Sequence, residues 1–135
     1  MAGTEADIRP GCRFCLANGL LVDTPILETT HFYMLGSIDP MVPIAGMLIP
    51  RRHSETPFGF EPAEWVDFGV ALAAARNHFG QRQPDGYTLG WNVGAVAGQH
   101  VFHAHLHIIP RFAGEPNEGV GLRRILRTPD WRPET

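Results

Sequence analysis

The segment from Val101 to Arg111 reads VFHAHLHIIPR, and its alternation of histidine with apolar residues decides both the fold and the chemistry to expect. Successive side chains of a strand point to opposite faces, so every second residue shares a face. We therefore expect a strand over residues 101–109, closed by Pro110. One face, which covers the core, holds Phe102, Ala104, Leu106 and Ile108. The other face holds Val101, His103, His105, His107 and Ile109.

The rest of the chain predicts one long helix among short strands. The strands are expected over residues 21–27, 31–38, 46–49 and 86–92, and the helix over residues 61–79. Pro62 suits the first helical turn, and the apolar residues Trp65, Phe68, Leu72 and Ala75 recur at helical spacing. A single helix between runs of short strands indicates an α+β fold with an antiparallel sheet.

Length and charge indicate a single domain with no general attraction to nucleic acid or membranes. The 135 residues suit a single domain over residues 1–135, with a core over about 12–112 and an extended arm over 113–135. A formal net charge of −3 offers no general attraction to nucleic acid or to a membrane. No apolar run approaches the roughly 18 residues of a membrane span, and the polar start lacks a signal-peptide core. We expect a cytoplasmic protein that binds neither nucleic acid nor membrane.

The basic and hydroxyl residues exclude several mechanisms. All 11 basic residues are arginines, so lysine Schiff bases, nucleotidyl-lysine and a P-loop lysine are excluded. Serine occurs only as Ser37 and Ser54, and neither lies in a nucleophile-elbow pattern. The histidines and the two cysteines remain as candidate nucleophiles.

The surroundings of the three histidines favour a phosphate ligand. An imidazole can act as base, acid, metal ligand or nucleophile near neutral pH. No carboxylate occurs between Asp85 and Glu115, Arg111 follows the strand, and the glycine-rich loop over 94–98 can turn backbone N–H groups inward to bind an anion. A metal ion held by all three histidines is a rival interpretation. It is disfavoured because the third ligand lies too far along the strand and no local carboxylate supports the ligands.

Cys12 and Cys15 stand at C-x-x-C spacing, which has several interpretations. A redox pair lacks a thioredoxin-like strand-to-helix context, and a disulfide is uncommon in a cytoplasmic protein. A zinc ion needs two further ligands, and thiolates combined with imidazoles make a closed tetrahedral site. Reduced cysteines without a metal are the remaining alternative.

Together, these motifs resemble the histidine triad (HIT) family of nucleotide hydrolases and transferases. The resemblance covers about residues 12–112 in consistent order and spacing. Its motifs are CRFC at 12–15, IPRRH at 49–53, WNVG at 91–94, AGQ at 97–99 and HAHLHIIPR at 103–111. It implies a HIT-like fold, an antiparallel sheet of about five strands with one long helix. It also implies a homodimer whose two sheets join.

The resemblance implies a hydrolase that works through a covalent intermediate. In that mechanism His105 attacks the α-phosphorus and water then cleaves the nucleotidyl-histidine, while His107 contacts the phosphate and assists the leaving group. Asn92 and Gln99 bind near the transferring phosphate, with loop amides stabilising its charge. The catalytic residues that we expect are His105, His107 and His103. The substrate-binding residues that we expect are Asn92, Gly98, Gln99, His100 and Ile38.

The resemblance also implies a structural zinc ion on Cys12, Cys15, His53 and His103, with no organic cofactor. The expected substrates are dinucleoside polyphosphates or nucleoside phosphoramidates, with a purine nucleotide of adenosine type. A nucleotide-binding regulator with negligible turnover is the alternative. A redox or scaffold protein resting on the cysteine pair is a third possibility, and it leaves the histidine strand without a role.

Three positions depart from the usual family pattern. Ser37 stands where an acidic residue often holds the ribose hydroxyls, and Ala45 where a histidine often precedes the Ile-Pro segment. His100 stands where a small hydroxyl residue is common. These departures affect the expected recognition of ribose and base more than the phosphorus chemistry.

Overall fold

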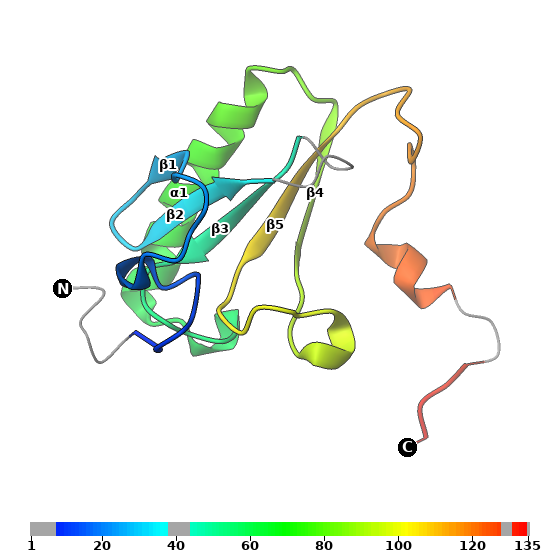
Figure 1. Ribbon diagram of the computed structural model, residues 1–135. Helices are drawn as coiled ribbons and strands as arrows, with labels where there is room; N and C mark the ends of the chain where they lie inside the picture. Colours follow the sequence, from blue (N-terminus) through cyan, green and yellow to red (C-terminus); the bar gives the residue numbers. More distant parts are fainter. Residues whose placement is uncertain (1–7, 38–43, 128–130, 135) are drawn as a thin grey trace.

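Five strands and one long helix form between residues 27 and 111 (Figure 1). The computed structural model describes residues 8–37, 44–127 and 131–134. The strands are β1 (Leu27–Glu28), β2 (Phe32–Gly36), β3 (Gly46–Pro50), β4 (Gly86–Trp91) and β5 (Leu106–Arg111), and the helix is α1 (Pro62–Gly80). Short 3₁₀ helices are η2 (Leu16–Asn18), η3 (Pro57–Gly59), η4 (Ala95–Ala97) and η5 (Leu122–Leu126).

The strands form one antiparallel sheet in the order β1-β2-β3-β5-β4. This is the α+β architecture that the sequence predicts. The register places His107 of β5 opposite Met47 of β3 and opposite Gly90 of β4. Because directly paired residues point to the same face, these three positions share one side of the sheet. The two-residue strand β1 and the six-residue strand β4 lie at the edges.

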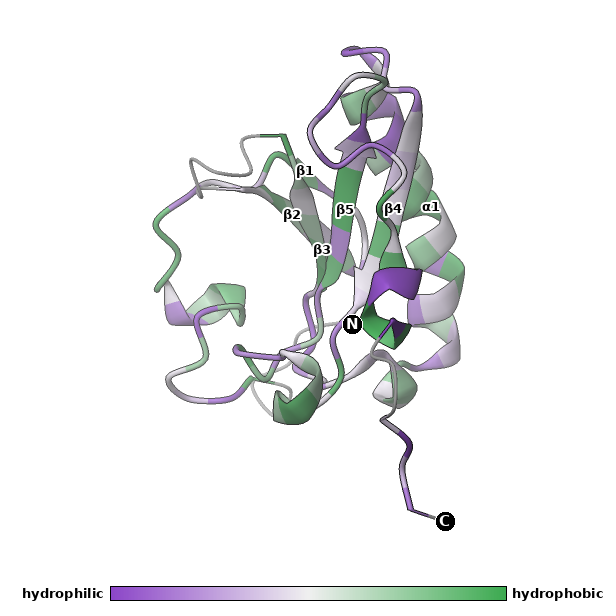
Figure 2. Cartoon of the chain, turned by 90° about the vertical axis from the view of Figure 1, so that its right-hand side faces the viewer, coloured by the Kyte–Doolittle hydropathy of each residue, from purple (hydrophilic) through white to green (hydrophobic). Residues whose placement is uncertain are grey.

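Helix α1 covers the opposite face of the sheet (Figure 2). Ala71, Ala75 and Phe79 are buried on its inner side, and Trp65 is half exposed at the rim. These helix residues pack with apolar residues of the central strands, which are Phe32, Met34, Leu48, Leu106 and Ile108. On β5 the expected alternation is confirmed, because Leu106 and Ile108 face this core while His107 faces away from it.

A buried ion pair fixes the start of α1 to the end of β3. The Arg52 guanidinium donates to Glu64 Oε1 at 2.8 Å, and the Glu64 side chain is only 3% exposed. Glu64 Oε1 also accepts from the backbone N–H of Glu61 at 2.8 Å, which satisfies a donor that the helix leaves free at its N-terminus. The segment after β3, including His53, is thereby held in place.

The other face of the sheet is covered in part by the N-terminal segment. Phe14, Tyr33, Leu35 and Ile49 form a second, smaller apolar cluster there. The buried Tyr33 hydroxyl donates to the backbone oxygen of Phe14 at 2.5 Å. This contact brings the segment with Cys12 and Cys15 onto the face that His107 occupies.

Two of the predicted strands are wrong in extent. The strand expected over 21–27 is irregular as far as Ile26, since Pro25 lacks an N–H and Val22 is 93% exposed. The strand expected over 101–109 begins only at Leu106, and Phe102, expected in the core, is 44% exposed. Strand β3 pairs with β5 only as far as Leu48, so residues 101–105 are free to bend toward other partners. The helix and the strands β2, β3 and β4 match the prediction within two residues, where the structure describes them.

Residues 112–127 run as an arm along the β4 side of the sheet, in orange in Figure 1. The arm contains η5, on which Ile125 and Leu126 are exposed. The division into a core over 12–112 and an arm over 113–135 stays a prediction. Among the described residues, no helix is both long and apolar enough to cross a membrane.

Candidate active site and metal centre

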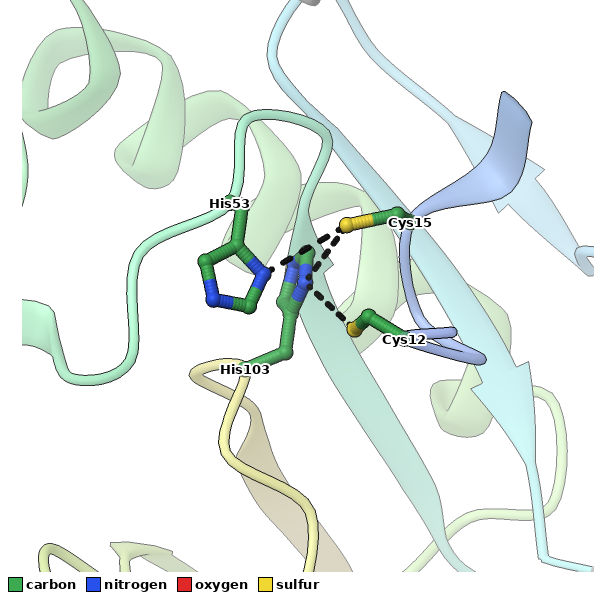
Figure 3. A group of neighbouring side chains, drawn as sticks. All are labelled: Cys12, Cys15, His53 and His103. Carbon is green, nitrogen blue, oxygen red and sulfur yellow. Dashed lines mark hydrogen bonds between the residues drawn. The ribbon is translucent and has the colours of Figure 1, made fainter. Parts of the chain in front are cut away.

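Four potential metal ligands from three distant segments meet at one point (Figure 3). Cys12 and Cys15 come from the N-terminal segment, His53 follows β3, and His103 precedes β5. Their ligand atoms all lie within 4.8 Å of one another. Cys12 Sγ lies 3.5 Å from His103 Nδ1, and Cys15 Sγ lies 3.4 Å from His53 Nδ1 and 3.6 Å from His103 Nδ1. The structure therefore contains a Cys₂His₂ cluster that is compatible with a metal ion.

The position of His103 corrects one prediction. The sequence placed it on one strand, on the same face as His105 and His107, but it precedes β5 and is completely buried. Its Nε2–H donates to the Pro50 backbone oxygen at 2.6 Å, so in the neutral ring the Nδ1 lone pair points to both sulfurs. The pKa of His103 is lowered to about 4, chiefly by burial and in smaller part by the nearby His53, although the hydrogen bond to Pro50 acts to raise it. A neutral imidazole oriented by a backbone carbonyl is the form that binds metals.

The spacing within the cluster fits a tetrahedral ion. Zinc binds sulfur at about 2.3 Å and nitrogen at about 2.0–2.1 Å, so two tetrahedral ligands of these kinds lie roughly 3.5 Å apart. The sulfur–nitrogen distances of 3.4–3.6 Å match that value. Both cysteines are free thiols, so no disulfide competes for the sulfurs. The four donors are also the set that structural zinc sites use.

His105 and His107 form a pair apart from this cluster. Their ring centroids are 5.0 Å apart, and the His105 ring also meets Phe14 edge-on at 5.2 Å. His105 Nδ1 lies 2.8 Å from the His103 backbone oxygen. A carbonyl can only accept, so Nδ1 carries the proton and Nε2 has a free lone pair in the neutral ring. His105 is therefore oriented as a nucleophile or a base.

The electrostatics of the pair favour neutral rings. Burial lowers the pKa of His105, and the positive charge of Arg13 lowers it further, against the hydrogen bond to His103. Burial also lowers the pKa of His107, with a smaller contribution from His105. Because the metal-compatible cluster takes His103 and leaves this pair outside, the geometry does not favour one metal shared by all three histidines.

The glycine-rich loop brings Gly98 close to Asn92, two of the predicted substrate contacts. A third predicted contact, Gln99, forms hydrogen bonds within the protein. Gly98 has a φ of +95°, which favours glycine, and a Cβ there would lie 3.8 Å from the Asn92 side chain. Gln99 is buried, and its Oε1 accepts from the Gly94 N–H at 2.8 Å. Its amide nitrogen donates to the Glu55 backbone oxygen at 2.7 Å. Gln99 thus holds the loop, and its contact with substrate stays a prediction.

The remaining predicted substrate contacts lie elsewhere. His100 is exposed and lines a hollow of about 370 Å³ beside the Cys₂His₂ cluster, together with Arg9 and Arg13. Ile38 lies outside the described residues, so its predicted contact stays a prediction.

A small pocket next to the histidine pair was not foreseen from the sequence. Its volume is about 90 Å³, and Phe14, which contacts His105, forms part of its wall. Met47, which pairs with His107, forms another part. Arg13 and Asp23 add charges of opposite sign to a mostly apolar lining. Phe14 lies between the two cysteines in the CRFC motif, so that motif was the signal that could have indicated it.

The comparisons with known proteins agree with this geometry. The profile of the HIT domain matches residues 21–114. The protein named hit from Bacillus subtilis is 30% identical over 128 residues, covering 91% of this chain and 85% of the relative. The crystal structure of a HIT family protein from Bacillus anthracis superposes with a TM-score of 0.71 at 29% identity, covering 83% of this chain and 79% of that one.

Another similar structure is that of a protein described as a hydrolase. It is a HIT family hydrolase from Clostridium thermocellum, with a TM-score of 0.66 at 25% identity, covering 81% of this chain and 97% of that one. The chain belongs to the HIT family, a class of nucleotide-binding hydrolases and transferases. The five-stranded antiparallel sheet and single long helix described above are the fold of these relatives.

Proposed function

We propose that this protein hydrolyses nucleotides at the α-phosphate, cleaving a phosphoanhydride or phosphoramidate bond through a nucleotidyl-histidine on His105. The observation that carries the proposal is the orientation of His105. Its Nδ1 donates to the His103 carbonyl at 2.8 Å, which leaves Nε2 as the free lone pair of a partly buried ring. The similar HIT family hydrolase of Clostridium thermocellum supports the same reaction class.

The reaction runs in two displacements. The Nε2 lone pair of His105 forms a bond to the α-phosphorus, and the bond from phosphorus to the leaving oxygen or nitrogen breaks with its electron pair on that atom. His107, whose ring centroid lies 5.0 Å from that of His105, contacts the phosphate and assists the departure of the leaving group, which takes up a proton. Water then attacks phosphorus and loses a proton, the N–P bond breaks, and the histidine lone pair is restored.

The neighbouring pocket supports a nucleoside on the attacked phosphate. Phe14 and Met47 connect the pocket to the histidine pair, so a base in the pocket leaves the α-phosphate beside His105. Its mostly apolar wall suits an aromatic ring, and the Asp23 carboxylate can accept from ribose hydroxyls or from an exocyclic amine. An adenosine-type nucleotide has both kinds of donor.

The Cys₂His₂ cluster holds a structural zinc ion in this proposal. Cys12, Cys15, His53 and His103 supply a closed set of four ligands, so the ion has no open position for substrate. When bound, it cross-links the N-terminal segment to the loops before β5 and after β3. Through the His103 backbone oxygen, the same cluster fixes the ring of His105.

The proposed assembly is a homodimer in which two sheets join. Strand β4 lies at the edge of the sheet with six residues, which offers a row of backbone donors and acceptors to a second copy. Strand β1, at the opposite edge, has only two residues.

The decisive experiment replaces the proposed nucleophile. The His105→Ala variant is expected to bind nucleotide while its kcat falls by at least about a thousandfold, as for other removed nucleophiles. Rapid quenching of the unsubstituted protein with radiolabelled substrate is expected to trap one acid-labile nucleotide per active site. The variant is expected to trap none.

His78→Ala serves as the matched control, because His78 is an exposed histidine in the last turn of α1. Its turnover is expected to equal that of the unsubstituted protein. Near-normal turnover in His105→Ala contradicts the mechanism. Nucleotide binding by the unsubstituted protein without turnover on any phosphoanhydride or phosphoramidate substrate favours the alternative, a nucleotide-binding regulator.

A further inference from the structure

Two opposite charges line the small pocket beside the histidine pair without pairing with each other. Arg13 and Asp23 both border this pocket of about 90 Å³. In the described part of the chain, neither side chain takes part in a hydrogen bond or an ion pair. The pocket therefore keeps a positive and a negative group apart, and both remain available to one ligand.

Arg13 is held by an aromatic ring and not by a carboxylate. Its guanidinium carbon lies 5.1 Å from the centroid of the Phe14 ring, which is a cation–π contact. Phe14 is buried, and its ring meets that of His105 edge-on at 5.2 Å. The contact with Phe14 uses the face of a ring and leaves the N–H donors of the guanidinium unused. Arg13 thus brings free donors to the pocket on the far side of Phe14 from the proposed nucleophile.

Asp23 reaches the same pocket from the segment before β1. Its side chain is half-buried, and the pocket wall beside it includes Leu35 and Gly36 of β2. A partly buried carboxylate without a hydrogen-bond donor loses hydration and gains nothing in return from the protein. A ligand that offers donors restores this loss, so Asp23 is placed to bind such a ligand.

The size of the pocket suits one edge of a base and not a whole nucleotide. Its volume of about 90 Å³ is well below the roughly 300 Å³ at which typical ligand pockets begin. A purine is joined to its ribose on one side and carries its hydrogen-bonding groups on the other. With the α-phosphate beside His105, the base enters by the edge that carries those groups, and this edge meets Arg13 and Asp23.

The two purines arrange their donors and acceptors differently along that edge. Guanine has two neighbouring acceptors, N7 and O6, followed by two neighbouring donors, N1–H and the exocyclic amine. In adenine the exocyclic amine, a donor, lies between the acceptors N7 and N1. A guanidinium offers two parallel donors and a carboxylate offers two acceptors. An arginine together with an aspartate therefore matches the grouping in guanine and not the alternation in adenine.

We propose that Arg13 and Asp23 select guanine as the base of the substrate, with Arg13 donating to O6 and N7 and Asp23 accepting from N1–H and the exocyclic amine. The inference rests on the proposed function, because it places the nucleoside of the same substrate in the same pocket. It replaces the adenosine-type nucleotide that the family resemblance implies. Asp23 alone is satisfied by either purine, but only guanine also offers Arg13 two neighbouring acceptors.

The test compares guanosine 5′-phosphoramidate with adenosine 5′-phosphoramidate, which share the reacting bond and differ only in the base. The kcat/KM of the unsubstituted protein is expected to be about tenfold or more higher for guanosine, since a good bidentate contact discriminates between bases by about that factor. In Arg13→Gln and in Asp23→Asn the preference is expected to fall to about threefold or less. The matched control is Arg76→Gln, which removes a positive charge from the exposed side of α1 and is expected to keep the preference.

Two further comparisons assign each contact to its residue. Inosine 5′-phosphoramidate keeps O6, N7 and N1–H but lacks the exocyclic amine. Asp23→Asn is therefore expected to cost the inosine substrate less than the guanosine substrate, whereas Arg13→Gln is expected to cost both equally. Arg13→Lys keeps the positive charge but loses the planar pair of donors, so the preference for guanosine is expected to fall while the melting temperature is kept.

Three results overturn the inference. One is an equal kcat/KM for the guanosine and adenosine substrates in the unsubstituted protein. Another is an equal loss for both substrates in Arg13→Gln, because the guanidinium then acts on the phosphate that they share or on the fold. The third is an equal loss for both in Asp23→Asn, because the carboxylate then holds the ribose that they share.

A binding measurement separates this inference from the proposed function. Titration calorimetry of guanosine and adenosine 5′-monophosphates into His105→Ala is expected to show tighter binding of the guanosine nucleotide by about tenfold or more, and a smaller difference when Arg13→Gln is added. If the unsubstituted protein hydrolyses no nucleotide, the proposed function fails while this titration still tests the pocket. If it hydrolyses both substrates equally well through His105, only the inference about the base fails.

Discussion

The two faces of the sheet differ in what covers them. On one face, α1 lies across the central strands, and the contact is a continuous apolar core that includes Met34, Leu48 and Ile108. On the other face, the N-terminal segment covers only part of the sheet with a smaller cluster around Phe14 and Tyr33. The Cys₂His₂ cluster adjoins that segment, and the His105–His107 pair lies next to it.

The difference separates stability from chemistry along a single strand. Leu106 and Ile108 are buried under the helix, while His107 is only partly buried on the opposite side. Apolar burial favours the folded state wherever it occurs, but reactive groups must keep a path to substrate. A strand with one fully covered face holds reactive side chains firmly on the other. Substitutions on the two faces should therefore separate stability from activity, apart from the metal cluster.

The largest effect on stability is expected from Cys15→Ser, which removes a ligand of the proposed zinc ion. Metal analysis of protein purified without chelator is expected to find about one zinc ion per chain, and far less in the variant. The free energy of unfolding is expected to fall by about 4 kcal/mol or more, because structural zinc contributes about 10–16 kcal/mol in small domains.

A chelator provides the matched comparison for Cys15→Ser. It should lower the melting temperature of the unsubstituted protein to that of the variant and leave the variant unchanged. The metal site would be contradicted if the unsubstituted protein, purified without chelator, contained no zinc and melted at the same temperature as Cys15→Ser.

An intermediate effect is expected from Leu106→Ala on the helix-covered face. Leu106 is 3% exposed, and truncating such a leucine removes packing and leaves a cavity, which costs about 3 kcal/mol. Chemical denaturation measures this loss. Below the new melting temperature, kcat is expected to stay within about twofold, since the side chain points away from the histidine pair. A large loss of kcat with intact folding would show that the two faces are coupled.

The smallest effect on stability is expected from His107→Asn, one residue further along β5. The free energy of unfolding at pH 7 should change by less than about 1 kcal/mol, because the side chain is only partly buried. By contrast, kcat should fall about a hundredfold, the usual contribution of a general acid or base. Steady-state kinetics and denaturation on one sample measure both.

The pH dependence of the free energy of unfolding gives a second test of the same variant. Burial lowers the pKa of His107 in the folded protein below the 6.5 of an unfolded chain. Between those two pKa values the unfolded state binds more protons, so this residue lowers the free energy of unfolding as the pH falls below 6.5. His107→Asn should therefore lose less stability than the unsubstituted protein between pH 7 and pH 5. An equal loss would show that folding leaves the pKa of His107 unchanged, and a greater loss that folding raises it, and either result contradicts the prediction.

Local patterns predicted most of the fold. Helix α1 starts at Pro62 as its first-turn signals indicate, and β2, β3 and β4 follow their apolar runs. The prediction was wrong where the alternation of side chains continued beyond the residues that pair with a neighbouring strand. Residues 101–105 alternate as a strand should, but the Ala104 N–H donates to the Ser54 backbone oxygen at 2.7 Å instead of to a neighbouring strand. Trp91 packs on the helix side of the sheet with Phe60 and Phe68.

For the site, the sequence by itself determined the inventory of reactive groups. The chain has no lysine, and its reactive groups are a single H-x-H-x-H segment and a C-x-x-C pair. These groups leave mainly imidazole and thiol chemistry to this protein. The residue types and their spacing limit the chemistry because nucleophiles and soft metal ligands are few among the amino acids.

The physical division of the three histidines comes from the tertiary structure. Spacing along one strand makes them equivalent, but His103 is turned into a buried cluster with two thiols, where its Nε2–H donates to Pro50 and its Nδ1 faces the sulfurs. The His103 carbonyl then fixes His105 as the ring with a free Nε2. The partners that make this division come from residues 12–15 and from the end of β3, far from the histidines in sequence. Because burial and hydrogen bonding depend on which segments meet in space, the spacing of the histidines could not assign these roles, and before the structure only the resemblance to the HIT family implied them.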